Sequence, residues 1–448
     1  MANVPRLPRV RRWAARVTVL AVLASMLVVP GATVAADDPT DMVLDWNINA
    51  INAIGNAPTA ATPGLGQPPP LAVIHHAMAH GAIYDAVNAI DGGHEAYLDG
   101  LPAVSATASK AAAVATAARD VLLGLATASP AVTASVEALY LASLAEIEAS
   151  ADKDAGIAIG HAAAAAMLLD RMGDGRFGSL AFTVGTEPGE WRPVPPVSNN
   201  VFAWVSLVRP FTLNSPDQLR TEGPPALTSA QYTAEFNEVK ALGAQAGSSR
   251  TEAQTLLAGF VSANPFVFMN RGLREIAMAH GLSTSEQALL FVRTSMSAAD
   301  ALIACWDNKV HWNFWRPQTA IQLAADDGNP DTVADPNWKS LISTPGYPDI
   351  ASGFNCFTAG TMYAARLYFG TDKVSFSLTS PGLPAGPGVV VPLPGSTREY
   401  SRFSDVIRDA IDGRIFNGLH FRVADVQGAW IGKKAAQWVD KHNFEAVD

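Results

Sequence analysis

The 448-residue sequence predicts an all-α protein in which two helix bundles pack together and a long proline-rich connection joins them. Alanine-rich segments with helical spacing of apolar residues fill the first half of the chain. The same spacing returns after residue 230, whereas residues 173–228 are rich in proline and lack it. Hydrophobic residues make up 49% of the chain and charged residues 16%, so a large core can form.

The first 36 residues predict a secretory signal peptide. Residues 1–16 contain five arginines and no acidic residue, an apolar run follows from Val17 to Val29, and small residues lead to Ala35-Ala36. This order is typical of a cleaved export signal, and the apolar run is too short to span a bilayer core of about 30 Å. Arg11-Arg12 leaves a twin-arginine signal open. We expect an exported, extracellular protein without a membrane segment after cleavage.

A single helical domain is expected over residues 37–448, with irregular structure over 37–70. The first bundle is expected over about 71–172, with helices at 71–90, 105–128, 130–149 and 152–172. The second is expected over about 230–441, with helices at 230–242, 251–261, 270–280, 284–306, 352–369, 399–412 and 420–441. Val389–Val391 is interpreted as a short strand or a loop. The string Ala-Met-Ala-His-Gly occurs at 77–81 and 277–281, which is weak evidence that the bundles are related.

Composition limits the classes of function. A net charge of -10 argues against a general nucleic-acid binder, which needs a basic surface. Cys305 and Cys356 are too few for a disulfide framework, and whether they pair stays open. His76 and His80 have the spacing of a zinc-binding helix, but Ala77 stands where a metalloprotease needs glutamate. We therefore expect these histidines to be ordinary core or surface residues.

The first segment with recognisable chemistry runs from Lys309 to Arg316-Pro317. Its two cations stand seven residues apart among tryptophan and phenylalanine, so a continuous helix would place them on one face. Buried cations require an anionic partner, and no carboxylate lies one helical turn from both. A bound oxyanion would satisfy them.

Two further segments supply complementary groups. Ser352-Gly353 opens a predicted helix, where a serine N-cap and free N–H groups favour an anion. Arg414 adds a forked guanidinium, and His420 adds an imidazole that can attack phosphorus or coordinate a metal oxyanion. Together these residues predict a cradle for phosphate or vanadate. The structural alternative is that the three cations pair with nearby carboxylates, namely Asp307, Asp405 and Asp412.

The three segments in this order resemble the vanadium-dependent haloperoxidase and type 2 phosphatidic acid phosphatase superfamily. Lys309, six residues and Arg316-Pro317 match its first motif, and Arg414, five residues and His420 match its third. His80–Ile90, Trp191–Pro193 and Ala304–Asp307 add to the likeness with bacterial haloperoxidase-like proteins. The resemblance implies that His420 is the axial vanadate ligand, or the nucleophile toward a phosphoester. The residues that it implies hold vanadate, or phosphate in its place, are Lys309, Arg316, Ser352, Gly353, Arg414 and His420.

The second motif departs from the family pattern. The family has Pro-Ser-Gly-His, whereas this chain has Ala351-Ser-Gly-Phe354, so the acid/base histidine is missing. Phenylalanine cannot transfer a proton, and general acid–base help is worth about 10²–10⁴-fold. The phosphatase pattern expects aspartate four residues after the histidine, where Ala424 stands with Asp425 next, which weakens that interpretation.

The resemblance implies a haloperoxidase-like oxidoreductase that oxidises halide with hydrogen peroxide for a small-molecule substrate. Phe354 favours an alternative, a relative that uses the same oxyanion site without halogenation, as a natural-product isomerase or an acid phosphatase. A third hypothesis is a non-catalytic anion-binding protein. A homodimer is left open.

Overall fold

The computed structural model describes residues 41–56, 67–125, 130–195, 197–386, 389 and 391–447; the predicted signal peptide lies outside them. The described residues are mostly helical, with one two-stranded sheet, which confirms the predicted fold class. The helices of the first half are α1 (Met42–Asn56), α2 (Pro69–Asp91), α3 (Lys110–Leu125), α4 (Pro130–Ala145) and α5 (Ala151–Asp170). The connection contains the short 3-10 helices η1 (Ala203–Leu207) and η2 (Pro216–Leu219).

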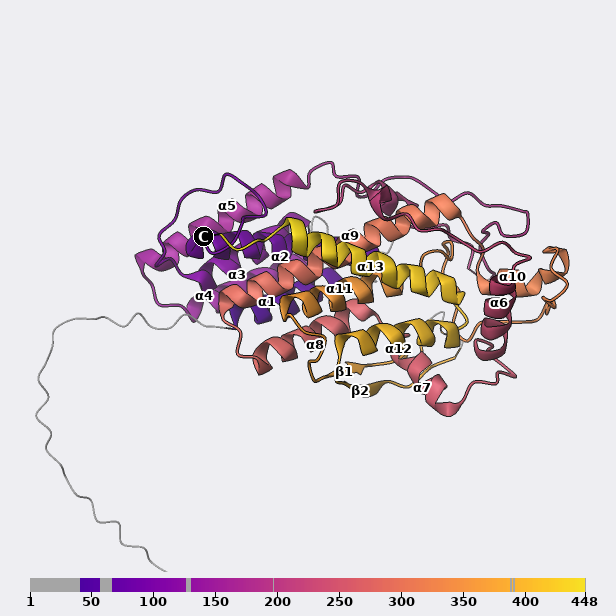
Figure 1. The fold of residues 1–448 in the computed structure, drawn as a ribbon. Helices are drawn as coiled ribbons and strands as arrows, with labels where there is room; N and C mark the ends of the chain where they lie inside the picture. Colours follow the sequence, from indigo (N-terminus) through magenta and orange to yellow (C-terminus); the bar gives the residue numbers. More distant parts are fainter. Residues whose placement is uncertain are drawn as a thin grey trace, which may run out of the picture. The chain divides into compact units, whose positions relative to one another are not determined.

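The second half begins with α6 (Ala230–Leu242) and ends with the long helix α13 (Arg422–His442). Between them lie α7 (Glu252–Phe260), α8 (Pro265–Ala279), α9 (Thr284–Trp312), α10 (Pro317–Gln322), η3 (Ala324–Asp326), α11 (Gly353–Tyr368), β1 (Phe376–Ser380), β2 (Ser396–Tyr400) and α12 (Phe403–Phe416). Figure 1 shows α9, α11 and α13 running side by side, with α6 and α10 at one end of them.

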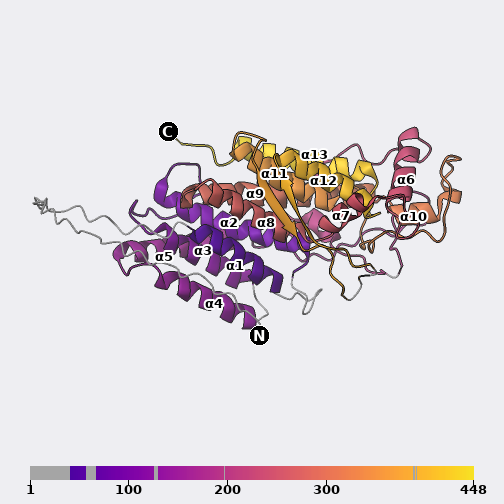
Figure 2. The same cartoon turned by 90° about the horizontal axis from the view of Figure 1, so that it is seen from below.

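The helices are arranged in layers. Figure 2 shows α11, α12 and α13 along one side, α2 and α9 in the middle, and α1, α3, α4 and α5 on the other side. Helix α9 touches α2, α11 and α13, so it joins the helices of the two halves. It is long and apolar enough to cross a membrane by composition alone, but its most apolar window is 89% buried inside the protein, as in a core helix.

Helix α1 corrects the expectation that residues 37–70 are irregular. Met42, Trp46 and Ala50 are buried at four-residue intervals, and Ile54 continues this apolar stripe. This is the period of an amphipathic helix. The segment contains few alanines, so its helix depends on the apolar stripe and not on alanine content. Residues 57–66 lie outside the described part of the chain.

Glycines allow the helices around α11 to approach closely. A Cβ on Gly428 of α13 would lie 2.6 Å from the carbonyl oxygen of Ser352, and one on Gly432 would lie 2.5 Å from that of Cys356. On the other face of α11, a Cβ on Gly360 would lie 2.9 Å from the carbonyl oxygen of Ser297 in α9. Because these gaps admit only hydrogen, α11 sits against both neighbours, and its N-terminus is held beside the start of α13.

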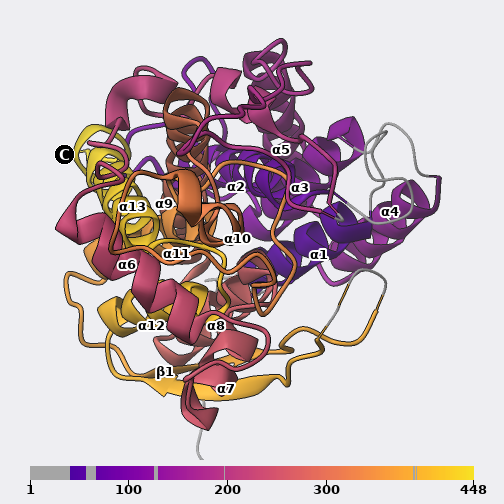
Figure 3. The same ribbon diagram turned by 90° about the vertical axis from the view of Figure 1, so that its right-hand side faces the viewer.

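A β-hairpin replaces part of an expected helix. Phe376 pairs with Tyr400 and Ser380 with Ser396, so α12 begins at Phe403 rather than at 399. Val389 and Val391 lie outside both strands. Figure 3 shows the hairpin and α7 at the periphery, away from the central helices.

The repeated pentapeptide does not mark equivalent places. Residues 77–81 are buried in the middle of α2, whereas 277–281 span the end of α8, where Met278 is 55% exposed and His280 is the C-cap. The recurrence therefore gives no structural evidence that the halves are related.

Candidate active site

Lys309 lies in the last turn of α9 and is fully buried. Its Nζ donates hydrogen bonds to the carbonyl oxygens of Pro348 at 2.7 Å and Asp349 at 3.0 Å. Burial and the neighbouring Arg316 charge lower the pKa of Lys309 to about 8. The ammonium is therefore held by backbone oxygens and has little solvent to compensate its charge.

Arg316 reaches the same place from a different element. Helix α9 ends at Trp312, Asn313 adopts a left-handed conformation with φ 45°, and Arg316 is the N-cap of α10, so the expected continuous helix is wrong. The two cations still meet, because the Tyr347 ring lies 5.1 Å from Lys309 Nζ and 5.0 Å from Arg316 Cζ. The chain reversal at Asn313 thus brings Lys309 and Arg316 together, as helical spacing was expected to do.

Ser352 occupies the predicted N-cap position of α11 and is fully buried. Its backbone N–H donates to the carbonyl oxygen of Ala424 at 2.9 Å, which fixes the cap against the start of α13. Gly353 follows because a Cβ there would lie 3.0 Å from the Trp306 ring. The first turn of α11 therefore presents N–H groups without helical partners at this point.

Arg414 and Phe354 lie together at the edge of the site. Arg414 Cζ lies 5.0 Å from the centre of the Phe354 ring, and its Nη1 donates to the carbonyl oxygen of Val261 at 3.2 Å. Desolvation lowers the pKa of Arg414 to about 10, although the nearby Asp425 opposes this shift. Phe354 is half-buried in the first turn of α11 and supplies an apolar wall there.

His420 lies two residues before α13, and only 2% of it is exposed. Its Nδ1 is 2.7 Å from Asp349 Oδ1, and Arg316 Nη1 is 3.2 Å from its Nε2. Burial first, and then the charges of Arg316, Arg414 and Lys309, lower its pKa well below the usual value. The imidazole is therefore neutral at pH 7 and keeps a lone pair available for an electrophile.

Asp349 is a site residue that sequence reasoning missed. It is fully buried between Arg316, whose Nη1 is 3.4 Å from Oδ1, and His420. Desolvation raises its pKa to about 7 against the opposing effect of the two cations Arg316 and Lys309. The expectation that these cations lack a carboxylate is therefore wrong, and the only signal in the sequence was an acidic residue three positions before Ser352.

The structural alternative for the three cations is also wrong. Each aspartate proposed as their partner forms an ion pair with another arginine: Asp307 with Arg220, Asp405 with Arg408, and Asp412 with Arg422. The described neighbours of the three cations include backbone carbonyls and the carboxyl groups of Asp349 and Asp425.

Orphaned donors test whether an oxyanion fits. Arg316 Nη2 and Arg414 Nε are buried and have no hydrogen-bond acceptor among the described residues. A buried N–H without an acceptor costs about 1–3 kcal/mol, more when it carries charge. Vanadate or phosphate would supply acceptor oxygens to both, so the residues present fit the group that the family resemblance implies.

A cavity of about 300 Å³ leads to the cradle. Trp306, Tyr347, Phe354, Phe357 and Arg414 line its inner part. Its other walls come from the start of α2, the connection and the start of α8, through Pro69, Pro70, Val73, Phe202, Asn264, Pro265 and Phe266, among others. The apolar walls suit an organic substrate, and Arg414 is the one charged side chain among the described lining residues.

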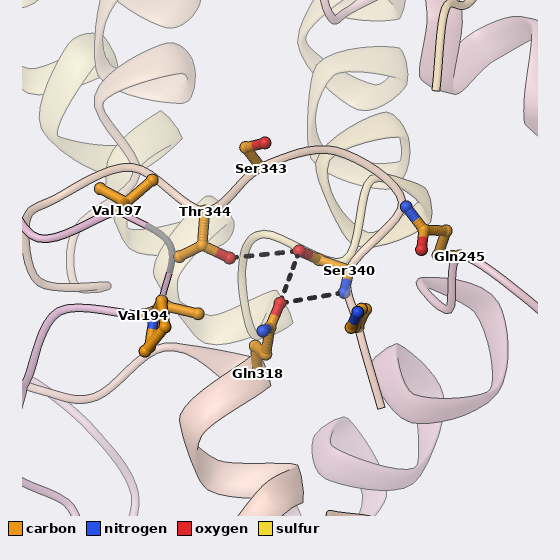
Figure 4. A pocket seen from close by; sticks show the side chains of 9 residues that line it. Val194, Val197, Gln245, Gln318, Ser340, Ser343 and Thr344 are labelled. Carbon is orange, nitrogen blue, oxygen red and sulfur yellow. Dashed lines mark hydrogen bonds between the residues drawn. The ribbon is translucent and has the colours of Figure 1, made fainter. Parts of the chain in front are cut away.

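A smaller pocket of about 130 Å³ lies beside the cradle and contains none of the predicted site residues. Figure 4 shows that Gln318 rises from α10 toward Ser340, which also contacts Thr344. Ser340 packs on Gly418, where a Cβ would lie 3.0 Å from its Cα. This polar network therefore packs against the loop that contains Gly418 and His420.

The cysteines and the zinc-like spacing resolve as ordinary features. Cys305 and Cys356 are buried free thiols, and Cys305 Sγ lies 3.2 Å from the carbonyl oxygen of Ala351. His76 and His80 are buried in α2, as expected of core histidines. The described residues contain no group of three or more histidine, cysteine, aspartate or glutamate side chains that could hold a metal ion.

Comparisons with known proteins show what the chain is similar to. Residues 289–448 match the family described as VCPO second helical-bundle domain. The chain is 30% identical to the vanadium chloroperoxidase of Curvularia inaequalis over 180 residues, a match that covers 33% of this chain and 29% of that enzyme. This chain therefore spans less than a third of the length of that curated relative.

Two solved structures share the fold over nearly the whole chain. A bacterial vanadium-dependent iodoperoxidase aligns with a TM-score of 0.73 and 22% identity, covering 91% of this chain and 98% of its own. A holo-type bacterial vanadium-dependent chloroperoxidase aligns with a TM-score of 0.71 and 16% identity, covering 90% and 97%. Residues 289–448 are therefore similar to the second helical bundle of VCPO proteins, and the fold of the chain is similar to that of bacterial vanadium-dependent haloperoxidases.

Proposed function

We propose that this protein is a vanadate-dependent haloperoxidase that oxidises halide with hydrogen peroxide. The observation that carries the proposal is the pair of orphaned guanidinium N–H groups, on Arg316 and Arg414, in a buried cradle of three cations at the inner end of the cavity. When bound there, vanadate would supply a Lewis-acidic centre that activates peroxide.

The chain's own residues would divide the work. Lys309, Arg316 and Arg414 neutralise the oxyanion charge, while the Ser352 hydroxyl and the first N–H groups of α11 donate hydrogen bonds. Asp349 Oδ1 lies 2.7 Å from His420 Nδ1 and would orient the imidazole, so that Nε2 would be the nitrogen with the lone pair. Phe354 and the aromatic walls limit the water that reaches this point.

A second candidate uses the same cradle without peroxide chemistry. Phe354 occupies the position of the family's acid/base histidine, which favours a phosphohydrolase or an isomerase of natural products. In the phosphohydrolase, neutral His420 would attack phosphorus and Lys309, Arg316 and Arg414 would hold the remaining oxygens.

One set of assays on the purified protein separates the candidates. Vanadate and phosphate are each titrated while thermal unfolding is followed, because a ligand of the folded state raises the melting temperature. Bromination of an electron-rich dye with peroxide and bromide is measured with and without vanadate, next to hydrolysis of an aryl phosphate. We expect vanadate to raise the melting temperature and to be required for bromination, and Lys309→Ala to abolish both.

Each other outcome has a defined meaning. Phosphate-ester hydrolysis that vanadate inhibits, without bromination, would favour the second candidate. An unchanged melting temperature with both anions would contradict the cradle itself and with it both candidates.

We also propose that the enzyme acts outside the cytoplasm, on the strength of the basic, apolar and small-residue order of residues 1–36. Mass spectrometry of the protein from the culture medium should find an N-terminus near residue 36 or 37. Full-length protein confined to the cytoplasm would contradict this proposal.

A further inference from the structure

Asp425 is a buried carboxyl group beside the cradle that the family motifs do not use. It lies in the first turn of α13, five residues after His420, and is fully buried. The hydrogen bond from Ser352 N–H to the Ala424 carbonyl and the missing side chain of Gly428 bring this turn against the start of α11. The sequence placed Asp425 one position away from the aspartate of the phosphatase pattern, but the fold places it at the site.

The contacts of this carboxyl group are few. Asn355 Nδ2 donates to Asp425 Oδ1 at 2.8 Å and to the Ser352 hydroxyl oxygen at 3.4 Å, so the carboxyl group and the hydroxyl share one amide as their neighbour. Oδ2 is buried and has no hydrogen-bond partner among the described residues. Desolvation raises the pKa of Asp425 well above its ordinary value, so the group keeps a proton under conditions in which an exposed aspartate would not.

We propose that Asp425 is the proton reservoir of this site and exchanges its proton with the bound oxyanion through the Ser352 hydroxyl. The proposal rests on the proposed haloperoxidase function and explains how that function survives with Phe354. In the forward step, the carboxyl O–H bond breaks as its proton passes to Ser352 Oγ, and the Ser352 O–H proton passes to an oxygen of the oxyanion. Asp425 becomes a carboxylate, and a proton from the solvent, the one that each turnover consumes, restores the carboxyl group.

The overall reaction needs such a proton. Oxidation of halide by peroxide follows H2O2 + X⁻ + H⁺ → HOX + H2O, so each turnover consumes one proton. Neutral His420 cannot serve both as the ligand of an oxyanion and as its acid, and Phe354 has no proton to give. Asp425 acts through Ser352 and does not itself touch the reacting atoms. It is therefore a positioning residue that holds a proton for the site.

The surrounding charges decide whether anion binding favours the protonated or the ionised form of Asp425. Arg414 of α12 favours the carboxylate of Asp425, whereas Asp349 disfavours it, and the Cys356 thiol of α11 lies nearby. A bound oxyanion adds negative charge to the site and offsets the influence of Arg414. We therefore expect anion binding to be accompanied by proton uptake at Asp425.

The test compares Asp425→Asn, which keeps the shape and loses the proton, with Asp425→Glu, which keeps the proton. Asp412→Asn, which lies on α12 in an ion pair with Arg422, is the matched control. The first readout is proton uptake on binding of inorganic phosphate, measured by calorimetry in buffers of different ionisation enthalpy from pH 6 to pH 9. Wild type should take up more protons than Asp425→Asn, and Asp425→Glu should resemble wild type.

The second readout is the pH profile of vanadate-dependent bromide oxidation. Wild-type rates should fall as pH rises through the Asp425 titration, and Asp425→Asn should lose that limb and about 10²-fold of the rate. Unchanged proton uptake and an unchanged pH profile in Asp425→Asn would overturn the proposal. Loss of phosphate binding that Glu does not restore would assign Asp425 a packing role and overturn it too.

Failure of the proposed function has a different signature. If wild type binds phosphate but never brominates, the calorimetric comparison still decides whether Asp425 exchanges a proton with the bound anion. If wild type binds neither anion, the cradle is wrong, and the proposal for Asp425 falls with it.

Discussion

Two buried clusters in this protein contain histidine and arginine, and they differ in the charge that they hold. In the first cluster, which is called the first-half cluster because its histidines lie in α2, Asn47 contacts His76, His80 and Asn270 through its Nδ2, and Arg274 of α8 donates to its Oδ1 at 2.5 Å. In the second half, the cradle combines three cations with two carboxyl groups and leaves guanidinium N–H groups without acceptors.

The first-half cluster is a structural network. His76 and His80 are uncharged because desolvation lowers the pKa of both, to about 3 for His80, and Phe266 and Phe291 pack on their rings. The cradle instead holds more charge than its own partners satisfy, next to a cavity of about 300 Å³. A buried histidine therefore does not identify a functional site, whereas orphaned buried donors beside a cavity do.

The largest expected difference between the clusters concerns anion binding. Arg414→Ala should weaken phosphate binding by up to about 10²-fold, since a hydrogen bond to a charged group is worth roughly 1.5–3 kcal/mol. Arg274→Ala should lower the melting temperature through the loss of its bond to Asn47 and leave phosphate affinity unchanged. Isothermal titration of both variants gives the affinities. Equal losses of affinity would remove the distinction between the two clusters.

A histidine added to the cradle should become functional, unlike those of the first half. In the Asp425→Asn chain, Phe354→His should raise vanadate-dependent bromide oxidation by about 10²-fold, because it places an acid/base group at the oxyanion. The gain should be smaller in the chain that retains Asp425, where the path through Ser352 already exists. Phe357→His, one turn along the cavity wall, is the control. A rate increase with Phe357→His as large as that with Phe354→His would show that position does not matter.

His80 of the first cluster and Asp349 of the cradle should respond to acid in opposite directions. The folded pKa of His80 lies near 3 and the unfolded value near 6.5, so the unfolded chain binds more protons in between and stability falls as pH drops below 6.5. Each such histidine contributes about 1.4 kcal/mol per pH unit to the free energy of unfolding. His80→Phe should reduce the slope of that free energy between pH 6.5 and 4.5 by about this amount, measured by urea unfolding.

Asp349 has the opposite sign, because its folded pKa of about 7 lies above the model-compound value of 3.8. Its folded form binds more protons, so its contribution is present in acid and is lost as pH rises toward 7. Asp349→Asn should therefore steepen the acid-side loss of stability. An identical slope in both variants and wild type would contradict the assignment of these groups.

The smallest expected effect concerns the aromatic ring shared by two cations. Tyr347→Leu removes the ring that lies about 5 Å from both Lys309 and Arg316, and should weaken phosphate binding by about 3- to 10-fold. Tyr347→Phe keeps the ring and should bind like wild type. Phe291→Leu, which removes the ring stacked on His80, should not change anion affinity. Binding by Tyr347→Leu equal to that of wild type would mean that the ring only fills space.

The sequence by itself determined the fold class and most helices, and it named the residues that are predicted to form the cradle. Alanine content and the 3.6-residue period depend on near neighbours, so α2 and α6 were found within a few residues of their ends. Helix caps are also local: Ser352 is the N-cap of α11 as its sequence context predicts. Two elements were not predicted. These are α1, whose helix depends on an apolar stripe, and the hairpin, whose strands pair across a loop.

Only the tertiary structure decided which groups face one another. Lys309 and Arg316 meet across a chain reversal. Both contact the ring of Tyr347, which lies more than 30 residues further along the chain. Asp349 and Asp425 enter the site because α11 and α13 pack through glycines, which brings residues 70 or more positions apart into contact. Such contacts depend on how helices stack and how loops return, and their electrostatic effect depends on burial. A linear pattern of residues contains neither.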